Sequence, residues 1–245
     1  MDRMLYTSMT GATEMVHAQT ITANNLANTS TNGFKKDLAV MMHRPVRHDQ
    51  DTRHYAVVTN KVQDFEPGHL IETHRELDIA IHGEGWIAVN GQDGTTGYTR
   101  AGALTVGADG LLRNRSGEVV LGNEGAVSIP PDSRVEIASD GTVNVFGTGE
   151  FEGDVAQIDR IMLVNPEMSK MEKGVDGLFR MRDGADAEPA AEVRLMSGVL
   201  EGSNVSAIES MTEMIQVSRQ YEMQVKMMKT ADELASRSSS ILRVS

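Results

Sequence analysis

The stretch ELDIAIHGEGWIAVNGQDGTTGYTRAGALTV (residues 76–106) consists of short runs of alternating apolar and polar residues, interrupted by Gly and Asp. A period of two is typical of β-strands with one buried face, and Gly with Asp marks the tight turns between strands. HGEGW (residues 82–86) contains Gly-x-Gly but no third Gly and no following helix, so it predicts a hairpin turn and not a dinucleotide site. The stretch therefore predicts a series of hairpins.

The same pattern continues downstream, in DGLLRNRSGEVVLG (109–122), SRVEIASDGTVNVFG (133–147) and VAQIDRIMLVNP (155–166). The chain has 245 residues, of which 23 are Gly and only 4% are aromatic. Many turns around a thin core suit this composition. We expect an all-β body domain over residues 67–202.

The N-terminal segment has a different period. Its apolar positions are spaced alternately four and three residues apart, as in a coiled coil, with one polar member: Leu5, Met9, Ala12, Val16, Gln19, Ala23 and Leu26. We expect a helix over residues 3–27. The following NNLANTSTNGFKK (24–36) is rich in Asn, a poor helix former, and Gly33 is expected to end the helix as a turn or C-cap residue.

The C-terminal segment repeats this spacing, at Ala207, Met211, Met214, Ser218, Tyr221, Val225, Met228, Asp232 and Ala235. Asn204 is a plausible cap for this helix. A lone helix of this length is marginal in water, so the two helices are expected to pair as a coiled-coil-like stalk or to contact other chains. The alternative is a helical hairpin that covers the β body as ordinary core.

The predicted fold class is α+β, with a mainly β body between two terminal helices. Residues 1–40 and 203–245 would form a terminal helical assembly domain. Residues 41–66 fit neither pattern and are expected to form an extended connector. Nine of the 16 Met fall in the two helical arms, where a flexible side chain suits a surface that fits more than one neighbour.

Composition and charge exclude several classes of function. The net charge is −12, and it lies in the middle of the chain, because each arm carries equal numbers of acids and bases. An acidic body disfavours nucleic acid and anionic lipid as partners. The chain has no Cys, which excludes thiol catalysis and disulfides. We expect no cleavable secretory signal and no membrane insertion, since the sequence lacks a long apolar run.

No catalytic constellation is recognisable. His43, His48 and His54, with Asp49 and Asp51, match no metal-ligand spacing, and the neighbouring Arg residues would oppose a cation. P-loop, G-x-S-x-G and H-E-x-x-H motifs do not occur. We therefore expect no catalytic residue, no metal and no cofactor.

Three segments resemble one protein family. NNLANTSTNGFKK (24–36) resembles the N-terminal signature of the bacterial flagellar axial proteins, the rod and hook subunits. LDIAIHGEGWIAV (77–89) followed by GYTRAGALTVGADGLL (97–112) resembles the body segment of the long rod and hook subunits. LEGSNVSAIESMTEMIQVSRQYEMQVKMMKTADE (200–233) is similar to their C-terminal helix signature. The resemblance spans nearly the whole chain, with its motifs in the family's order.

Within the family, MDRMLYTSMTGA (1–12), PGHLIETHRELDIAI (67–81) and LVNPEMSKMEKGVDGLFR (163–180) look like a proximal rod subunit. A distal rod subunit or a hook-type subunit is the alternative. Outside the family, the competing hypotheses are a secreted hydrolase and a β adaptor that binds one partner through its terminal helices. A closed complex of fixed stoichiometry would favour the adaptor.

The resemblance implies a structural subunit that stacks helically into the flagellar rod, the drive shaft that crosses the periplasm and transmits torque. It implies partners among the proximal and distal rod subunits and copies of this chain, and export through the flagellar type III apparatus. Asn24, Asn25 and Asn28 would bond to related positions on neighbours, because an amide offers both donor and acceptor. Alternatively, Asn28 only terminates the helix. The expected assembly interface comprises Leu5, Met9, Ala12, Val16, Asn24, Asn25, Leu26, Asn28, Gly33, Phe34, Ala207, Met211, Met214, Tyr221, Val225 and Met228.

Overall fold

The computed structural model describes residues 2–45, 54–131, 133–147 and 155–242, and the chain divides into two compact units. The helical unit comprises Met1–Thr29, Lys36–Asp64 and Val205–Ser245, and the β unit comprises Ser30–Lys35 and Phe65–Asn204. The predicted α+β class, with a helix at each end of a mainly β chain, is confirmed.

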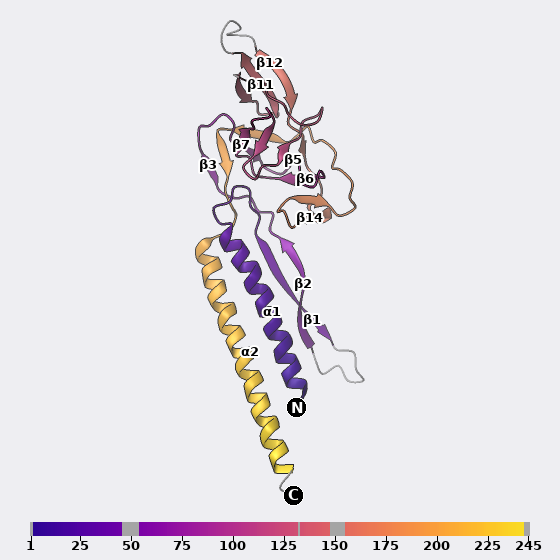
Figure 1. Cartoon of the computed structure of the whole chain (residues 1–245), viewed down its shortest axis with the longest axis vertical. Coiled ribbons are helices and arrows are strands. Elements are labelled where there is room, and N and C mark those ends of the chain that lie inside the picture. Colours follow the sequence, from indigo (N-terminus) through magenta and orange to yellow (C-terminus); the bar gives the residue numbers. More distant parts are fainter. Residues whose placement is uncertain (1, 46–53, 132, 148–154, 243–245) are drawn as a thin grey trace. The chain divides into compact units, whose positions relative to one another are not determined.

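In the helical unit, helix α1 (Asp2–Ala27) lies beside helix α2 (Ala207–Leu242), and the two run antiparallel (Figure 1). They approach closely where a side chain on Gly11 would meet Gln224. Ser206 caps α2, because its hydroxyl accepts the Glu209 N–H at 3.4 Å. The cap is therefore Ser206 and not Asn204, whose side-chain amide instead donates to the Glu66 carbonyl within the β unit. Among the described residues, no helix is long and apolar enough to cross a membrane.

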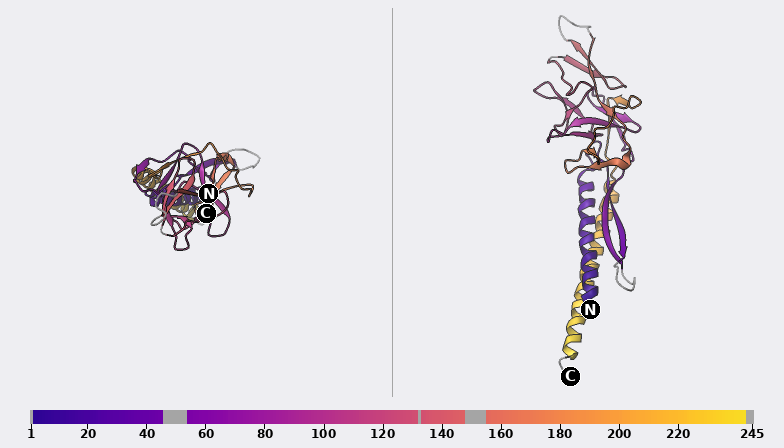
Figure 2. Two further views of the ribbon diagram at one scale, coloured as in Figure 1. Left: turned by 90° about the horizontal axis from the view of Figure 1, so that it is seen from above. Right: turned by 90° about the vertical axis from the view of Figure 1, so that its right-hand side faces the viewer.

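The segment expected to be an extended connector forms a β-hairpin. Strands β1 (Asp37–Pro45) and β2 (His54–Gln63) pair antiparallel, and they run alongside the helices in both views (Figures 1 and 2). Ala39 packs against the small core of this unit, which consists of Met15, Ala18 and Val217. Two apolar stretches form this pair of strands. The Arg and His residues between them obscure the strand pattern in the sequence.

The β unit is built from short antiparallel strands around one large sheet. This sheet has the order β14-β15-β6-β5-β9-β8-β7, with β13 also paired to β5. Its strands are β5 (Trp86–Asn90), β6 (Thr96–Thr99), β7 (Leu104–Val106), β8 (Leu112–Asn114), β9 (Val119–Val120), β13 (Leu163–Val164), β14 (Met171–Lys173) and β15 (Phe179–Met181). A 3-10 turn, Met168–Lys170, precedes β14.

Smaller sheets complete the unit. A three-stranded sheet joins β10 (Ser133–Ile137), β11 (Thr142–Gly147) and β12 (Val155–Arg160). Two pairs link distant parts of the chain: β16 (Arg194–Ser197) with β4 (Ile79–His82), and β17 (Val199–Glu201) with β3 (Leu70–Glu72). The last strands of the unit therefore pair with its first ones.

The prediction of a hairpin turn at residues 82–86 is wrong. β4 pairs with β16, whereas β5 pairs with β6, β9 and β13, so the turn connects strands of different sheets. Gly85 has φ +134°, and a Cβ there would lie 2.7 Å from Val193. The glycine is needed for this close approach, which the local sequence does not reveal.

Two apolar clusters form the core of the β unit. The larger contains Ile79, Ile87, Leu104 and Leu112 among its fully buried members. The second is aromatic: the Trp86 ring lies 4.6 Å from Phe179 and 5.9 Å from Phe65, measured between ring centroids. Trp86 is the only Trp in the chain, so its fluorescence reports on this unit alone.

Candidate functional site

The β unit contains a buried ionic cluster that joins three distant segments. Glu201 at the end of β17 accepts a hydrogen bond from Lys35 Nζ at 2.7 Å through Oε1 and one from Arg100 Nη1 at 3.0 Å through Oε2. The Gly68 N–H donates to the same Oε1 at 3.0 Å. All three charged side chains are almost completely buried. We call Lys35, Arg100 and Glu201 the Glu201 cluster.

Both cations of the cluster have further partners. Lys35 Nζ also donates to the Glu66 carbonyl at 2.8 Å, and Arg100 Nη2 donates to the Gly83 carbonyl at 2.8 Å. The Arg100 guanidinium lies 5.5 Å from the centre of the Trp86 ring, a favourable cation–π arrangement. These contacts compensate two positive charges that a single carboxylate cannot balance alone.

The pKa of Glu201 is lowered from its ordinary value. Burial disfavours the charged carboxylate and raises the pKa, but the Lys35 hydrogen bond, the Arg100 charge and the Gly68 N–H together outweigh it. Glu201 therefore stays ionised in the folded chain. Such an arrangement of opposite charges holds the three segments together.

Gly33 brings the N-terminal signature onto this cluster. Its φ is +69°, its N–H donates to the Glu201 carbonyl at 2.8 Å, and a Cβ there would collide with the backbone of Arg100. Only glycine permits both the conformation and the close approach. The next residue is Phe34, and Nζ of Lys173 lies over its ring, 3.9 Å from the ring centre. Gly33 and Phe34, predicted as assembly residues, thus make contacts within the β unit.

The asparagines have separate roles. Asn25 is buried, and its side chain donates to the Asp37 carbonyl at 2.8 Å and accepts the Asp37 N–H at 3.0 Å. This differs from the expectation that Asn25 faces a neighbouring subunit. Asn28 donates to the Asn24 carbonyl at 2.9 Å, a local contact at the end of α1 that agrees with helix termination. Asn24 is exposed.

The predicted apolar stripe of α1 is only partly buried. Met9 and Val16 are exposed, Leu5 and Leu26 are half-buried, and Ala12 is buried. The face that is buried within the unit carries mostly small or polar residues instead: Ser8, Gly11, Met15, Ala18, Thr22 and Asn25. Small residues allow close approach of the backbone, but a search for large apolar residues does not find them.

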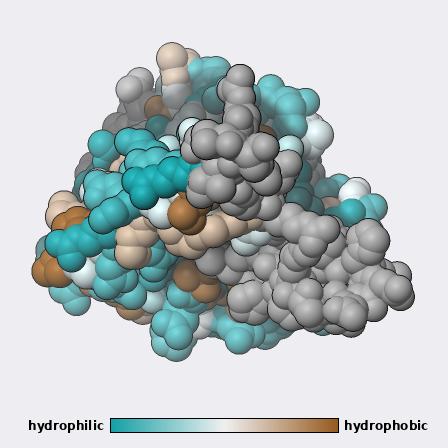
Figure 3. Space-filling view, turned by 90° about the horizontal axis from the view of Figure 1, so that it is seen from below, coloured by the Kyte–Doolittle hydropathy of each residue, from teal (hydrophilic) through white to brown (hydrophobic). Residues whose placement is uncertain are grey.

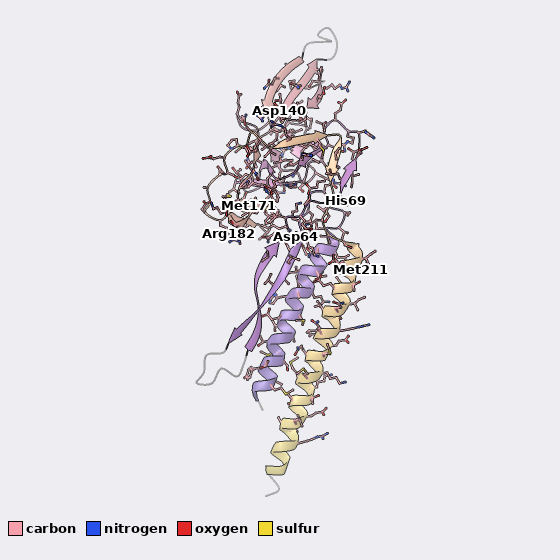
Figure 4. The ribbon with its side chains drawn as sticks, turned by 180° about the vertical axis from the view of Figure 1, so that it is seen from behind. Asp64, His69, Asp140, Met171, Arg182 and Met211 are labelled. Carbon is pink, nitrogen blue, oxygen red and sulfur yellow. The ribbon has the colours of Figure 1, made fainter. Side chains whose placement is uncertain are left out.

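On α2 the predicted stripe lies at the edge of the buried face. Met214, Val225, Met228 and Ala207 are half-buried, whereas Met211 and Tyr221 are exposed. The most buried residues are Ser210, Val217 and Ala231. Sequence reasoning missed Ile208 and Ile215, which with the predicted Met211 form a second apolar stripe that we call the outer face of α2. Met211 projects from the side of α2 away from α1 (Figure 4).

Within the described part of the chain, the His, Asp and Glu side chains form no metal site. Among its described residues, no group of three or more His, Asp or Glu side chains could hold a metal ion. Of the five residues weighed as ligands, His48, Asp49 and Asp51 lie outside the described residues, and His43 and His54 lie on β1 and β2.

Comparison with known families matches the three segments that meet in the Glu201 cluster. Residues 5–35 match the family described as flagella basal body rod protein, residues 80–145 the flagellar hook protein FlgE/F/G D1 domain, and residues 196–241 the C-terminal family of flagellar basal body rod FlgEFG proteins. Lys35, Arg100 and Glu201 each fall in one of these ranges. The matches define a chain of the flagellar rod and hook class.

Full-length relatives narrow this class. The chain is 39% identical to the flagellar basal-body rod protein FlgF of Salmonella typhimurium and 36% identical to that of Escherichia coli, in both cases over 100% of each chain. It is 33% identical to the rod protein FlgG of Agrobacterium fabrum, over 88% of this chain and 90% of that protein. The chain belongs to the flagellar basal-body rod protein FlgF family.

Proposed function

We propose that the chain is a structural subunit of the flagellar basal-body rod, located in its proximal part, and that it polymerises through the exposed faces of its terminal helices. The observation that carries this proposal is an uncovered apolar surface on the helical unit. Membership of the rod protein family supports a structural role over a catalytic one. The partners are copies of this chain and other rod subunits, including the distal rod protein FlgG.

The distribution of exposed apolar residues supports assembly through the helical unit. Among the described residues, every exposed large apolar side chain belongs to this unit except Leu70, Ile71, Val106 and Val175. Apolar side chains gathered at a surface mark interaction sites. Apolar residues are visible among polar ones in the view from below (Figure 3).

The outer face of α2 is the strongest candidate surface. Ile208, Met211 and Ile215 follow the i, i+3, i+7 spacing of one helix face, and Ile208 is 81% exposed. Full burial of a side chain of this size contributes about 1.5–3 kcal/mol. Met9 and Val16 on α1 offer a second such surface. A subunit with uncovered faces on both helices can contact more than one neighbour.

The remaining steps follow from the proposed role. The subunit is exported through the flagellar type III apparatus, reaches the rod in the periplasm and transmits torque as part of the drive shaft. The absence of Cys supports passage as an uncrosslinked chain. The net charge of −12 supports protein partners over nucleic acid.

Complementation tests this function. A strain that lacks the chain would receive the wild type, the double variant Ile208→Glu with Ile215→Glu, or the control Val175→Glu. Val175 is fully exposed but lies in the β unit, so its variant adds one such charge away from the helices, against two in the double variant. We expect motility and complete basal bodies by electron microscopy with wild type and control, and neither with the double variant.

Two results would count against the proposal in different ways. Complete rods in the strain without the chain would show that it is not a rod subunit. Normal motility of the double variant, produced at wild-type level, would show that the outer face of α2 is not an assembly surface.

A further inference from the structure

Methionines are unevenly distributed between the two units. Met4, Met9, Met211, Met223 and Met227 are exposed, and all five belong to α1 or α2; we call them the surface methionines. Among the described residues of the β unit, every Met is buried or half-buried, and Met171 is 1% exposed. The chain has no Cys, so the thioethers are its only reactive sulfur.

We propose that the surface methionines are an oxidant-sensitive modification site, and that their conversion to methionine sulfoxide by a peroxide blocks subunit association. The inference rests on the proposed function, because it assigns these side chains to faces that become covered on assembly. The oxidant class is hydrogen peroxide or an organic hydroperoxide. The modification acts on the subunit before assembly, while the side chains are exposed.

The chemistry is an oxygen-atom transfer. The sulfur lone pair attacks one peroxide oxygen, the S–O bond forms and the O–O bond breaks, and the proton of the attacked oxygen passes to the departing hydroxide, which leaves as water. The sulfur is oxidised by two electrons, and hydrogen peroxide is reduced to water. Since the thioether carries no proton that must leave first, access of the oxidant to the sulfur controls the rate. Met211 at 53% and Met223 at 58% exposure therefore react long before Met171.

The sulfoxide changes the surface without changing the fold. A thioether on an exposed helix position becomes a polar group that water solvates, so the subunit itself tolerates it. Covering that group against an apolar neighbour requires its desolvation without a partner, which is unfavourable. Association is thus expected to weaken by about tenfold or more when a covered Met carries the oxygen.

Peptide mass spectrometry of the purified full-length chain tests the site. After graded hydrogen peroxide, we expect the oxygen adduct on Met211 and Met223 while Met171 stays unmodified in the same sample. Met171 serves as an internal control, so the readout does not depend on a functional rod. Similar rates at Met171 and Met211 in the folded chain would overturn the inference.

Sedimentation of the same samples tests the consequence. We expect peroxide to reduce self-association, and methionine sulfoxide reductases to restore it. The variant in which all five surface methionines are Leu, which is apolar and similar in volume, should associate regardless of peroxide, whereas Met171→Leu should remain sensitive. Undiminished association of a fully oxidised wild type would overturn the inference. Association of the untreated chain is measured in parallel and tests the proposed function separately.

Discussion

The β unit buries its large side chains, whereas the helical unit exposes them. The largest fully buried side chains of the described chain, including Trp86, Tyr98, Lys35 and Glu201, all lie in the β unit. Among the described residues, the buried apolar cluster of the helical unit has three members, Met15, Ala18 and Val217. One unit completes its core within the chain. The other leaves apolar side chains exposed, as the proposed assembly through its helices requires.

Charge follows the same division. The β unit encloses two cations and a carboxylate, a costly arrangement that it compensates with hydrogen bonds from the backbone and an aromatic face. In the helical unit, the ion pair between Lys36 and Glu209 is 3.6 Å long, and Glu209 is exposed. The Glu201 cluster should therefore matter for stability, and the exposed pair should contribute little.

Removing the carboxylate of the cluster should have the largest effect. Glu201→Ala removes the buried carboxylate that both Lys35 and Arg100 contact, and we expect it to destabilise the β unit by about 3–5 kcal/mol. Urea unfolding followed by Trp86 fluorescence measures this. The matched control, Glu209→Ala, lies in the helical unit, so its unfolding is followed by circular dichroism at a helix band, and it should cost about 0.5 kcal/mol or less. Equal effects of the two variants would abolish the distinction between the units.

Gly33→Ala tests the backbone contact at the same cluster. The left-handed conformation costs a non-glycine residue about 1–2 kcal/mol, and the collision of the new Cβ with Arg100 adds about 1–3 kcal/mol. Gly117→Ala is the control, since its φ is +91° but no atom lies within 4 Å of the added carbon. We expect Gly33→Ala to destabilise the chain more than Gly117→Ala, because only the Cβ added at Gly33 collides with Arg100. Equal unfolding midpoints would show that the backbone yields at Gly33.

The Glu201 cluster should also make the stability of the chain depend on acidic pH. A carboxyl group whose folded pKa lies below its unfolded pKa stabilises the fold above the ordinary value of 4.5, and this contribution is lost as the pH falls through the folded pKa. The free energy of unfolding of the wild type should therefore fall more steeply below pH 4.5 than that of Glu201→Gln.

Asp176→Asn is the control for the acid experiment. A hydrogen bond from Arg180 lowers the pKa of Asp176 as well, but this pair is more exposed to solvent. Solvent screens the contribution of this pair to stability. Asp176→Asn should therefore change the slope of the unfolding free energy below pH 4.5 less than Glu201→Gln does. An unchanged slope in Glu201→Gln would show that other carboxyl groups control acid unfolding.

Structural features that depend on local sequence patterns, such as the N-terminal helix, could be predicted from the sequence. The helix expected over residues 3–27 extends over Asp2–Ala27, because apolar spacing and the asparagines at its end are local signals. The Glu201 cluster could not be predicted from spacing, because Lys35 and Glu201 are 166 positions apart and charged residues usually indicate surface. Lys35, Arg100 and Glu201 do lie inside the three family signatures, which was the available signal.

The helix faces show a different limit. Large apolar residues repeat on α1 at positions such as Met9 and Val16, yet the buried face uses Ala18 and other small residues. Hydrophobic periodicity finds the face with the largest side chains, and it does not tell whether the covering partner belongs to the same chain.

The smallest effect on stability is expected at Ile215, although it lies only two positions from Val217 on α2. Val217 is buried in the core of the helical unit, so Val217→Glu places a charge among Met15 and Ala18 and should cost at least about 2 kcal/mol. Ile215 is 55% exposed, and Ile215→Glu should stay within about 0.5 kcal/mol of the wild type. Both long helices belong to this unit, so circular dichroism at a helix band measures its melting, while Trp86 fluorescence confirms that the β unit is unchanged. Because both variants introduce the same residue into the same helix, propensity cannot explain a difference. An equally large fall in melting temperature for Ile215→Glu would mean that the outer face of α2 is already covered within the chain, and this face would then be unable to serve a neighbour.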